Sequence, residues 1–308
     1  MELNDVRAFV RVVDRGSVSA AARDLHITQS AVTKRLQRLE ASLGAKLFDR
    51  TQRPVGLTAA GQSAVEKCRR LLNDMNDLRA AVSDGHAAAL ADVRVGVAHA
   101  LGEVVLTEPL GIVREEFPHH GLRLTTGWSL DLLDLVRTGA LDAAIILLPE
   151  ADRLPAEVLG TVLGKERLVI LGPRPMRKMR RTRARRIIDL AGVQWILNPE
   201  GCGARAILRR ELARAGVDVV AVVESYTYEL QLLLASQGRG LTLAPERLFQ
   251  MSRSRSRLEI LRVAGLHLPF TIWSVQRASA ELEPLFGRLN ALLQATLAQP
   301  RRSRSARS

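Results

Sequence analysis

Polar side chains that can read the bases of a nucleic acid lie on one face of a predicted helix near the N-terminus. Thr28 is a good N-cap, and apolar residues follow it at helical spacing, at Val32, Leu36, Leu39 and Leu43. The residues outside this apolar stripe are Gln29, Ser30, Thr33, Lys34 and Gln37. Glutamine, serine and threonine can donate to and accept from base edges, and lysine can contact guanine or phosphate. The pattern predicts recognition of double-stranded DNA, with a solvated helical face as the alternative.

Two shorter helical patterns precede this helix and position it. The first begins at Leu3 and ends near Gly16, and Ser17 then caps a short helix over residues 18–25. His26 makes the turn before Thr28. Two helices joined by such a turn are typical of the helix-turn-helix, whose second helix enters the major groove with its N-terminal residues. We therefore include Ser17 and Thr28 among the predicted DNA-binding residues.

A basic turn follows the third helix. Two short extended segments, within residues 44–51 and 53–58, predict a β-wing around this turn. Arg50 and Arg53 stand where a wing could contact phosphate or the minor groove. Residues 1–58 are thus predicted to form an all-α winged helix-turn-helix domain.

A long helix is predicted after the wing, over residues 59–89. Its apolar positions alternate by three and four residues, which suits a two-stranded helical contact. The predicted dimerisation residues are Val65, Cys68, Leu72, Met75 and Val82. Packing of this helix on its own domain is the alternative.

The N-terminal pattern as a whole resembles that of the LysR-type transcriptional regulators. The similarity covers residues 1–61 and lies in Gly16-Ser17-Val18-Ser19-Ala20-Ala21-Ala22, Leu25-His26-Ile27-Thr28-Gln29-Ser30-Ala31-Val32-Thr33, Leu39-Glu40, Leu43-Gly44, Leu47-Phe48 and Leu57-Thr58-Ala59-Ala60-Gly61. The resemblance implies a regulator that binds an interrupted palindrome in promoter DNA. It also implies pairing through the linker helix into a homodimer or homotetramer, with RNA polymerase as a further partner.

The remaining chain alternates between strand and helix patterns from Asp92 onward, so the fold class is α/β overall. The LysR resemblance implies a periplasmic-binding-protein-like effector domain over residues 90–298. Its two α/β subdomains would comprise 92–157 with 271–298, and 166–264. The chain would cross between them near 158–165 and 265–270, and a small-molecule effector would bind in the cleft between the subdomains.

Four loops are predicted to line this cleft, because strand ends and helix N-termini offer free backbone N–H groups to anions. Their candidate effector-binding residues are His99, Ala100, Leu101, Trp128, Ser129, Asn198, Gly201, Cys202, Arg205, Tyr226 and Thr227. The loops supply aromatic surface, hydroxyl groups and one cation, Arg205. We therefore expect a small organic anion with an apolar or aromatic body, anchored at residues 201–205.

Other function classes find little support in the sequence. There is no P-loop, no GxSxG and no GxGxxG after a strand, and the two cysteines lack zinc-site spacing, so we expect no enzyme, metal or cofactor. A DNA-binding architectural protein that senses nothing remains an alternative. The sequence contains no candidate membrane span and no secretory signal, so we expect a cytoplasmic protein.

The formal net charge is +13, and much of it lies outside the predicted DNA-binding domain. The run 174–186 contains eight basic residues and no acidic one, and we expect it to be a solvated loop. The tail 299–308 is rich in arginine and serine and is predicted to be disordered.

Overall fold

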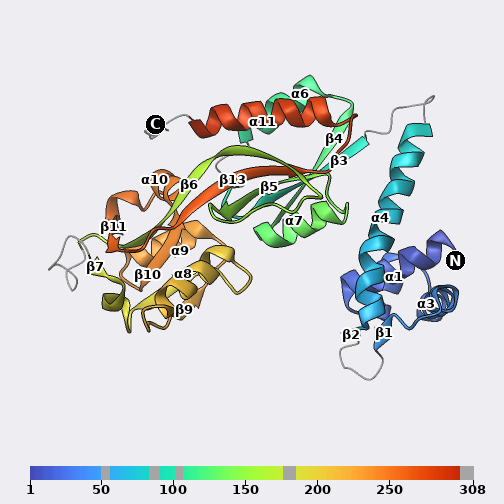
Figure 1. Ribbon diagram of the computed structural model, residues 1–308, viewed down its shortest axis with the longest axis horizontal. Coiled ribbons are helices and arrows are strands. Elements are labelled where there is room, and N and C mark those ends of the chain that lie inside the picture. The colour runs from blue at the N-terminus through green and yellow to red at the C-terminus, as the bar shows by residue number, and fades with distance from the viewer. Residues whose placement is uncertain (50–55, 83–90, 102–106, 176–184, 299–308) are drawn as a thin grey trace. The chain divides into compact units, whose positions relative to one another are not determined.

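The computed structural model describes residues 1–49, 56–82, 91–101, 107–175 and 185–298 (Figure 1). The predictions for Arg50 and Arg53, for most of the run 174–186 and for the tail 299–308 lie outside these residues. The chain forms two compact units, one built mainly on residues 1–91 and the other mainly on the residues that follow.

The N-terminal unit contains the predicted helix-turn-helix and wing. Its elements are α1 (Leu3–Arg15), α2 (Val18–Asp24), α3 (Gln29–Leu43), β1 (Phe48–Asp49), β2 (Gly56–Leu57) and α4 (Ala59–Val82). Ser17 caps α2, its hydroxyl accepting from the Ala20 N–H at 3.3 Å, and Thr28 caps α3 by accepting from the Ala31 N–H at 3.2 Å. The two β segments pair antiparallel, with Phe48 opposite Leu57.

The turn between α2 and α3 uses a left-handed residue. His26 has φ 53°, and the Ile27 N–H returns to the Ala22 carbonyl at 3.0 Å, which closes α2 with a Schellman motif. Ala21 and Ala22 are fully or almost fully buried, so α2 can approach its neighbours closely. The turn therefore fixes the angle at which α3 leaves α2.

The junction of α3, the wing and α4 depends on one buried carboxylate and one glycine. Glu40 accepts hydrogen bonds from the Leu47 N–H at 2.8 Å and the Lys46 ammonium at 3.1 Å. Although burial opposes them, these bonds hold the pKa of Glu40 below its ordinary value. Thr58 donates to the Lys46 carbonyl at 2.7 Å and accepts from the Gly61 N–H at 3.0 Å. A Cβ at Gly61 would lie 2.1 Å from the Leu47 carbonyl oxygen, so only glycine fits there.

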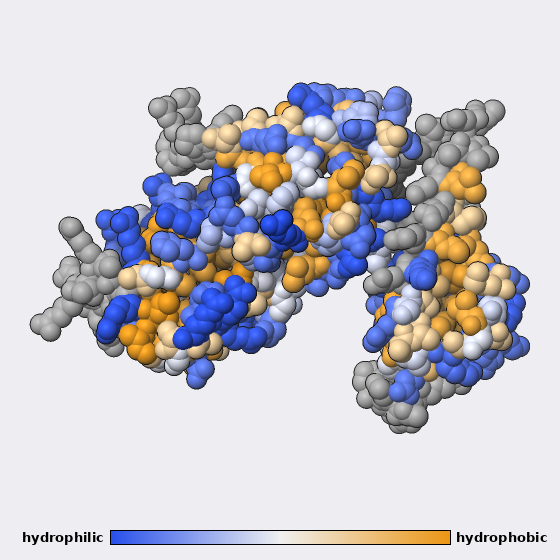
Figure 2. Space-filling view, viewed as in Figure 1, coloured by the Kyte–Doolittle hydropathy of each residue, from blue (hydrophilic) through white to orange (hydrophobic). Residues whose placement is uncertain are grey.

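The long helix α4 packs partly on its own unit. Val65 and Cys68 are buried in the hydrophobic core of the N-terminal unit, and Leu72 packs against that core. Leu71 and Leu78 remain exposed, at 37% and 57%, and Figure 2 shows apolar surface along this helix. Its first half therefore belongs to the DNA-binding unit, while Leu71 and Leu78 keep apolar surface that the described residues do not cover.

The second unit is an α/β structure with one long composite sheet. Its strands are β3 (Ala91–Ala98), β4 (His120–Gly127), β5 (Ala143–Pro149), β6 (Leu159–Pro173), β7 (Arg185–Arg186), β8 (Gln194–Leu197), β9 (Val220–Glu224), β10 (Leu241–Pro245), β11 (Leu258–Leu261), β12 (Val263–Ala264) and β13 (Pro269–Gln276). Its helices are α6 (Thr107–Glu116), α7 (Ser129–Arg137), α8 (Gly203–Ala213), α9 (Tyr228–Ser236), α10 (Glu246–Met251) and α11 (Glu283–Ala298), with short 3₁₀ turns at Ile187–Leu190 and Arg255–Arg257.

Strand β6 connects the two halves of this sheet. The strand order is β4-β3-β5-β13-β6-β10-β8-β9, with β11 also paired to β6 and a separate β7–β12 pair. Over Leu159–Arg167, β6 pairs antiparallel with β13, and from Leu168 onward it pairs with β10 and β11. The changeover at Arg167 and the return through β12 and β13 divide the unit into two α/β halves. In Figure 1, α6 and α11 lie together on one face of the first half. Within the described residues, no helix is both long and apolar enough to span a membrane.

Replacing Gly61 with alanine should destabilise the DNA-binding unit. The added Cβ would overlap the Leu47 carbonyl, and overpacking of this kind typically costs about 1–3 kcal/mol. Gly111→Ala is the matched control, because this glycine lies in α6 with open space around it and alanine favours a helix by about 0.5–1 kcal/mol. Thermal unfolding by circular dichroism measures the stability of both variants. Hydrogen exchange over residues 1–82 shows whether Gly61→Ala loosens the DNA-binding unit. Unchanged hydrogen exchange in Gly61→Ala would contradict the close contact between Gly61 and the Leu47 carbonyl.

Candidate DNA-binding surface and effector cleft

The N-terminal turns of α3 hold their polar side chains in a local network. The Gln29 amide donates to the Ser19 hydroxyl at 3.1 Å, and the hydroxyls of Thr28 and Ser30 lie 3.0 Å apart. The Thr33 hydroxyl donates to the Gln29 carbonyl at 2.9 Å. Gln29, Thr28 and Ser30 are exposed. The structure thus brings these predicted residues together at the end of α3 that a recognition helix presents to a groove.

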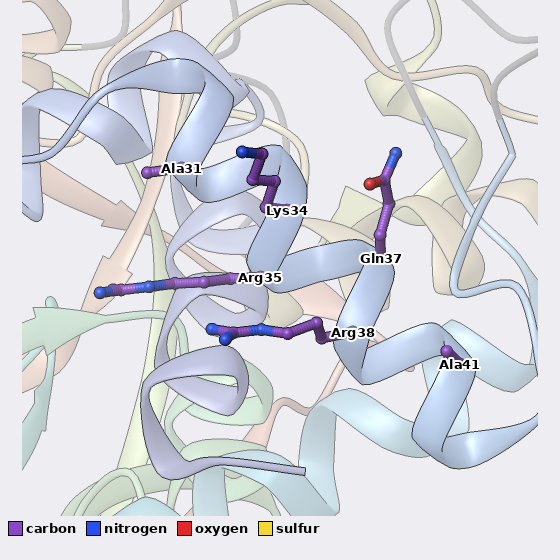
Figure 3. Close-up of a pocket in the computed structure, with 6 residues that line it drawn as sticks. All are labelled: Ala31, Lys34, Arg35, Gln37, Arg38 and Ala41. Carbon is purple, nitrogen blue, oxygen red and sulfur yellow. The ribbon is translucent and has the colours of Figure 1, made fainter.

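The middle of α3 presents a second set of side chains, shown in Figure 3. A shallow surface hollow there is lined by Ala31, Lys34, Arg35, Gln37, Arg38 and Ala41. Lys34 and Gln37 extend in the same direction and are exposed, and neither has a partner among the described residues. Arg38 is engaged instead, since its guanidinium donates to the buried Asp5 carboxylate at 2.7 Å.

Arg35 was missed as a candidate by sequence reasoning. It lies four residues after Ala31 and three before Arg38, beside the predicted polar face, and lines the same hollow. Its helical spacing from Ala31 was the signal that could have found it. With Lys34 and Arg35, the hollow offers two cations to a polyanion.

The predicted dimerisation residues separate into two groups on α4. Val65, Cys68 and Leu72 face the core of their own unit, and the Arg69 guanidinium donates to Asp14 of α1 at 2.5 Å. Met75 is half-buried, and the side chain of Val82 lies outside the described atoms. Of the residues predicted for the seam, only Met75 thus stands with the exposed Leu71 and Leu78 on one stripe, at spacings of four and three residues.

In the second unit, a cavity of about 210 Å³ opens where the predicted effector loops meet. Of the predicted residues, His99, Ala100, Trp128, Ser129 and Cys202 line it. The other lining residues are Ala98, Gly127, Leu130, Leu147, Leu148, Pro149, Asp152, Gly203, Ala204, Ala206, Ile207, Arg210, Tyr228 and Phe270. Most of these side chains are apolar, and they come from both halves of the sheet.

An aromatic contact spans the two halves beside the cavity. The rings of Trp128 and Tyr226 stack with centroids 5.6 Å apart, and His99 lies 4.7 Å from Trp128 and 5.7 Å from Tyr226. Gly201 has φ +93°, and a Cβ there would lie 3.1 Å from the Trp128 indole. Gly201 and Tyr226 therefore contact Trp128 without lining the cavity themselves.

The predicted anchor Arg205 does not line the cavity. Its guanidinium contacts Glu224 at 2.6 Å and Glu200 at 3.0 Å, and donates to the Asn198 carbonyl at 2.9 Å. The Asn198 amide in turn donates to the Ser225 carbonyl at 3.1 Å. These contacts tie the loop before α8 to the end of β9, so the charge of Arg205 is already compensated.

Leu101 and Thr227 also lie away from the cavity. Leu101 is buried in the core at 2% exposure, and Thr227 is the residue before α9. Leu101 therefore has a packing role in this structure, and neither residue is among those that line the cavity.

Two helix N-termini open onto the cavity. Trp128 precedes α7, which begins with Ser129 and Leu130, and Cys202 precedes α8, which begins with Gly203 and Ala204; all six line the cavity. The partial positive charge at such ends favours an anion. Arg210 and Asp152 are the charged side chains among the lining residues. Burial lowers the pKa of His99, so its imidazole is neutral at pH 7 and adds no charge.

The Cys202 thiol lies at the start of α8 and is buried. Burial raises its pKa, although the N–H groups of Arg205 and Ala204 favour the thiolate. The thiol is therefore protonated at neutral pH. Within the described part of the chain, no group of His, Cys, Asp and Glu side chains is arranged to hold a metal ion.

Comparisons with known proteins agree with this two-unit organisation. Residues 3–62 match the model of the bacterial regulatory helix-turn-helix protein, lysR family, and residues 88–298 match the LysR substrate binding domain. The transcriptional regulator CzcR of Bacillus cereus is 29% identical over 248 residues, which cover 80% of this chain and 81% of the relative. A probable hydrogen peroxide-inducible genes activator of Mycobacterium avium is 29% identical over 294 residues, covering 94% and 92%.

A solved structure shows the same fold. Full-length CbnR in complex with its target DNA superposes with a TM-score of 0.58 at 21% identity, covering 96% of this chain and all of that one. Regulators of the LysR family bind promoter DNA and small-molecule effectors and form oligomers. The substrate-binding model alone spans more than half of the sequence, and the helix-turn-helix model accounts for most of the remainder. This chain therefore belongs to the LysR family and is a DNA-binding transcriptional regulator with an effector-binding domain.

Proposed function

We propose that the effector is a small organic anion held in the cavity between the two halves of the second unit. The observation that supports this most is the meeting of two helix N-termini and Arg210 around a mainly apolar cavity. The anionic group would accept from the first-turn N–H groups of α7 and α8, and an apolar body would pack on Trp128 and Phe270. We assign the anchoring charge to Arg210, which lines the cavity and has one carboxylate partner, Glu211 at 3.3 Å, whereas Arg205 lies off the cavity between Glu200 and Glu224.

The size of the cavity limits the effector. Its volume of about 210 Å³ lies below the roughly 300–1,000 Å³ of pockets for drug-sized ligands, so the effector is a compact molecule. Asp152 also lines the cavity and would repel a second anionic group placed near it. A monoanion with an apolar body therefore fits better than a polyanion.

A thiol-based response is the competing way to control such a regulator. It would need a thiolate at Cys202, because the thiolate is the reactive species. The raised pKa of this buried thiol disfavours that state at neutral pH. We therefore propose regulation by a bound ligand rather than by oxidation.

Anions should stabilise the protein where their neutral analogues do not. We expect benzoate to raise the melting temperature and benzamide, which has the same ring, to leave it unchanged. A ligand at a hundred times its Kd stabilises by about 2.7 kcal/mol. Arg210→Gln should reduce the shift, whereas Arg209→Gln, its exposed neighbour, should not.

Titration of the full-length protein by differential scanning fluorimetry over a panel of paired carboxylates and amides measures this difference. Equal shifts of the melting temperature with acids and amides would contradict the proposal that the effector is an anion. No shift with any compound would favour a DNA-binding protein that senses nothing.

We further propose that α3 reads bases in the major groove. Gln37 is exposed and unengaged among the described residues, so it can meet a base edge without losing an internal hydrogen bond. Gln29 and Thr33 would have to give up the hydrogen bonds they make within the protein in order to bond to a base. Lys34 and Arg35 would contribute mainly to phosphate binding.

Gln37→Ala should therefore lower specific binding by about 1–3 kcal/mol, the usual value of a lost base contact, and leave binding to random DNA unchanged. Fluorescence anisotropy on an operator selected from a random duplex library, and on scrambled duplex, measures both. Gln62→Ala, an exposed glutamine at the start of α4, is the control. A parallel loss on both duplexes would show that Gln37 contacts only the backbone.

Dimerisation is proposed to use the exposed stripe of α4. Leu71, Met75 and Leu78 share one side of the helix, and pairing with a second copy would remove their apolar surface from water. The buried Val65 and Cys68 would support the helix from within its own unit.

Replacing Leu71 and Leu78 together with glutamate should dissociate the dimer, because the seam would then enclose charge. Operator binding should fall with it, since half-sites about one helical turn apart need two readers. Sedimentation velocity and anisotropy follow the two effects. Gln62→Glu places one such charge on the opposite side of α4 and should change neither the sedimentation nor the operator binding. A double variant that still sediments as a dimer would place the interface elsewhere.

A further inference from the structure

An array of arginines lies at one end of the second unit, and none of them lines the cavity. The segment 252–257 reads Ser-Arg-Ser-Arg-Ser-Arg, and Arg174 and Arg239 stand near it. We call Arg174, Arg239, Arg253, Arg255 and Arg257 the arginine cluster. All five side chains are exposed.

The sheet topology brings three of these residues together, Arg174, Arg239 and Arg257. Arg174 follows the end of β6, and both neighbours of β6 run antiparallel to it. In the β6–β10 register Thr242 lies opposite Leu171, and in the β6–β11 register Leu258 lies opposite Pro173. The residues just before β10 and β11 therefore meet the residue just after β6, which places Arg239 and Arg257 on either side of Arg174.

A backbone hydrogen bond supports this placement. The Arg174 N–H donates to the Arg257 carbonyl at 2.8 Å.

Alternating serines hold the segment 252–257 in place. Ser252 and Ser254 are buried, at 9% and 1% exposure, whereas the arginines between and after them face solvent. The Ser252 hydroxyl donates to Glu229 at 3.1 Å and accepts from the Ser254 N–H at 3.0 Å. Arg257 donates to the Ser254 hydroxyl at 3.4 Å. The arginines are thus presented from a fixed backbone rather than from a free chain.

The cluster lacks acidic partners among the described side chains. No ion pair joins any of its five arginines to a carboxylate of the described residues, in contrast to Arg205 and Arg167 in the same unit. Like charges held together without neutralisation cost electrostatic free energy, which a polyanion would relieve. The segment itself consists of serine and arginine alone, whereas protein–protein interfaces usually have an apolar centre.

We propose that the arginine cluster is a second DNA-binding surface that contacts phosphates of double-stranded DNA. Guanidinium groups match phosphate geometry and carry no base preference when they bind the backbone. DNA is the expected partner, because the N-terminal unit binds DNA and thereby raises the local concentration of DNA around the same molecule. The cluster would add affinity without adding sequence specificity.

The test is the salt dependence of binding by the full-length protein to random-sequence duplex DNA. Arg253, Arg255 and Arg257 are replaced together with glutamine. Each phosphate contact contributes about 0.9 to the slope of log K against log salt concentration, so the slope should fall by about 2 to 3. The same three positions changed to lysine should keep most of the slope, since lysine retains the charge.

A charge-matched control replaces three exposed arginines of the same unit, Arg114, Arg209 and Arg214, with glutamine. This variant removes the same net charge and should leave the slope within experimental error of the wild type. Circular dichroism confirms that all variants fold, and discrimination between operator and random DNA should be preserved in each.

Equal slopes for the cluster variant and the control would overturn the proposal. So would a cluster variant that binds DNA normally but loses binding to poly-glutamate, because the cluster would then be a docking surface for an acidic protein. A reduced slope in the cluster variant alone supports a contact with DNA phosphates.

Discussion

The effector-binding unit depends on the backbone hydrogen bonds of a single strand. β6 pairs with β13 up to Arg167 and with β10 and β11 from Leu168, so the same strand belongs to both halves of the sheet. The buried N–H and C=O groups of β6 need hydrogen-bond partners. Separating either half of the sheet from β6 would therefore leave buried polar backbone groups unpaired. Beside the changeover, Arg247 of α10 lies 3.5 Å from the buried Glu166 and donates to the Leu297 carbonyl of α11 at 2.9 Å. The two halves of the sheet that line the cavity are therefore both held by β6.

Buried carboxylates have a similar role in the DNA-binding unit. Asp5 accepts from the Glu2 N–H at 3.1 Å and from Arg38, and Glu40 accepts from the Leu47 N–H. Both acids are almost fully buried, where an unpaired charge would be costly. Asp5 joins the start of α1 to α3, and Glu40 joins α3 to the wing. Because α3 is held from behind in this way, Lys34 and Gln37 on its other side stay exposed and unengaged among the described residues.

Cations in this chain differ in what surrounds them, and this decides which of them can bind an anion. Arg205 is enclosed by Glu200, Glu224 and a carbonyl, so it stabilises a loop. Arg210 lines the cavity and has one carboxylate partner, Glu211 at 3.3 Å. The arginine cluster forms no ion pair with a carboxylate of the described residues. The net charge of +13 is therefore less informative than the pairing of individual groups. Helix N-termini add to the cavity a positive potential that no count of charged residues includes.

The sequence by itself determined the parts of this protein whose signals are local. Caps such as Ser17 and Thr28, the turn at His26 and the apolar stripe of α3 act within a few residues, so the helix-turn-helix and the α/β class were predictable. The neighbours of a side chain across the fold were not. Tertiary packing turned Arg205 toward two glutamates, put Val65 and Cys68 in their own core and brought Tyr226 onto Trp128. It also gathered Arg174, Arg239 and Arg257, because strand register, unlike periodicity, joins residues far apart in the chain.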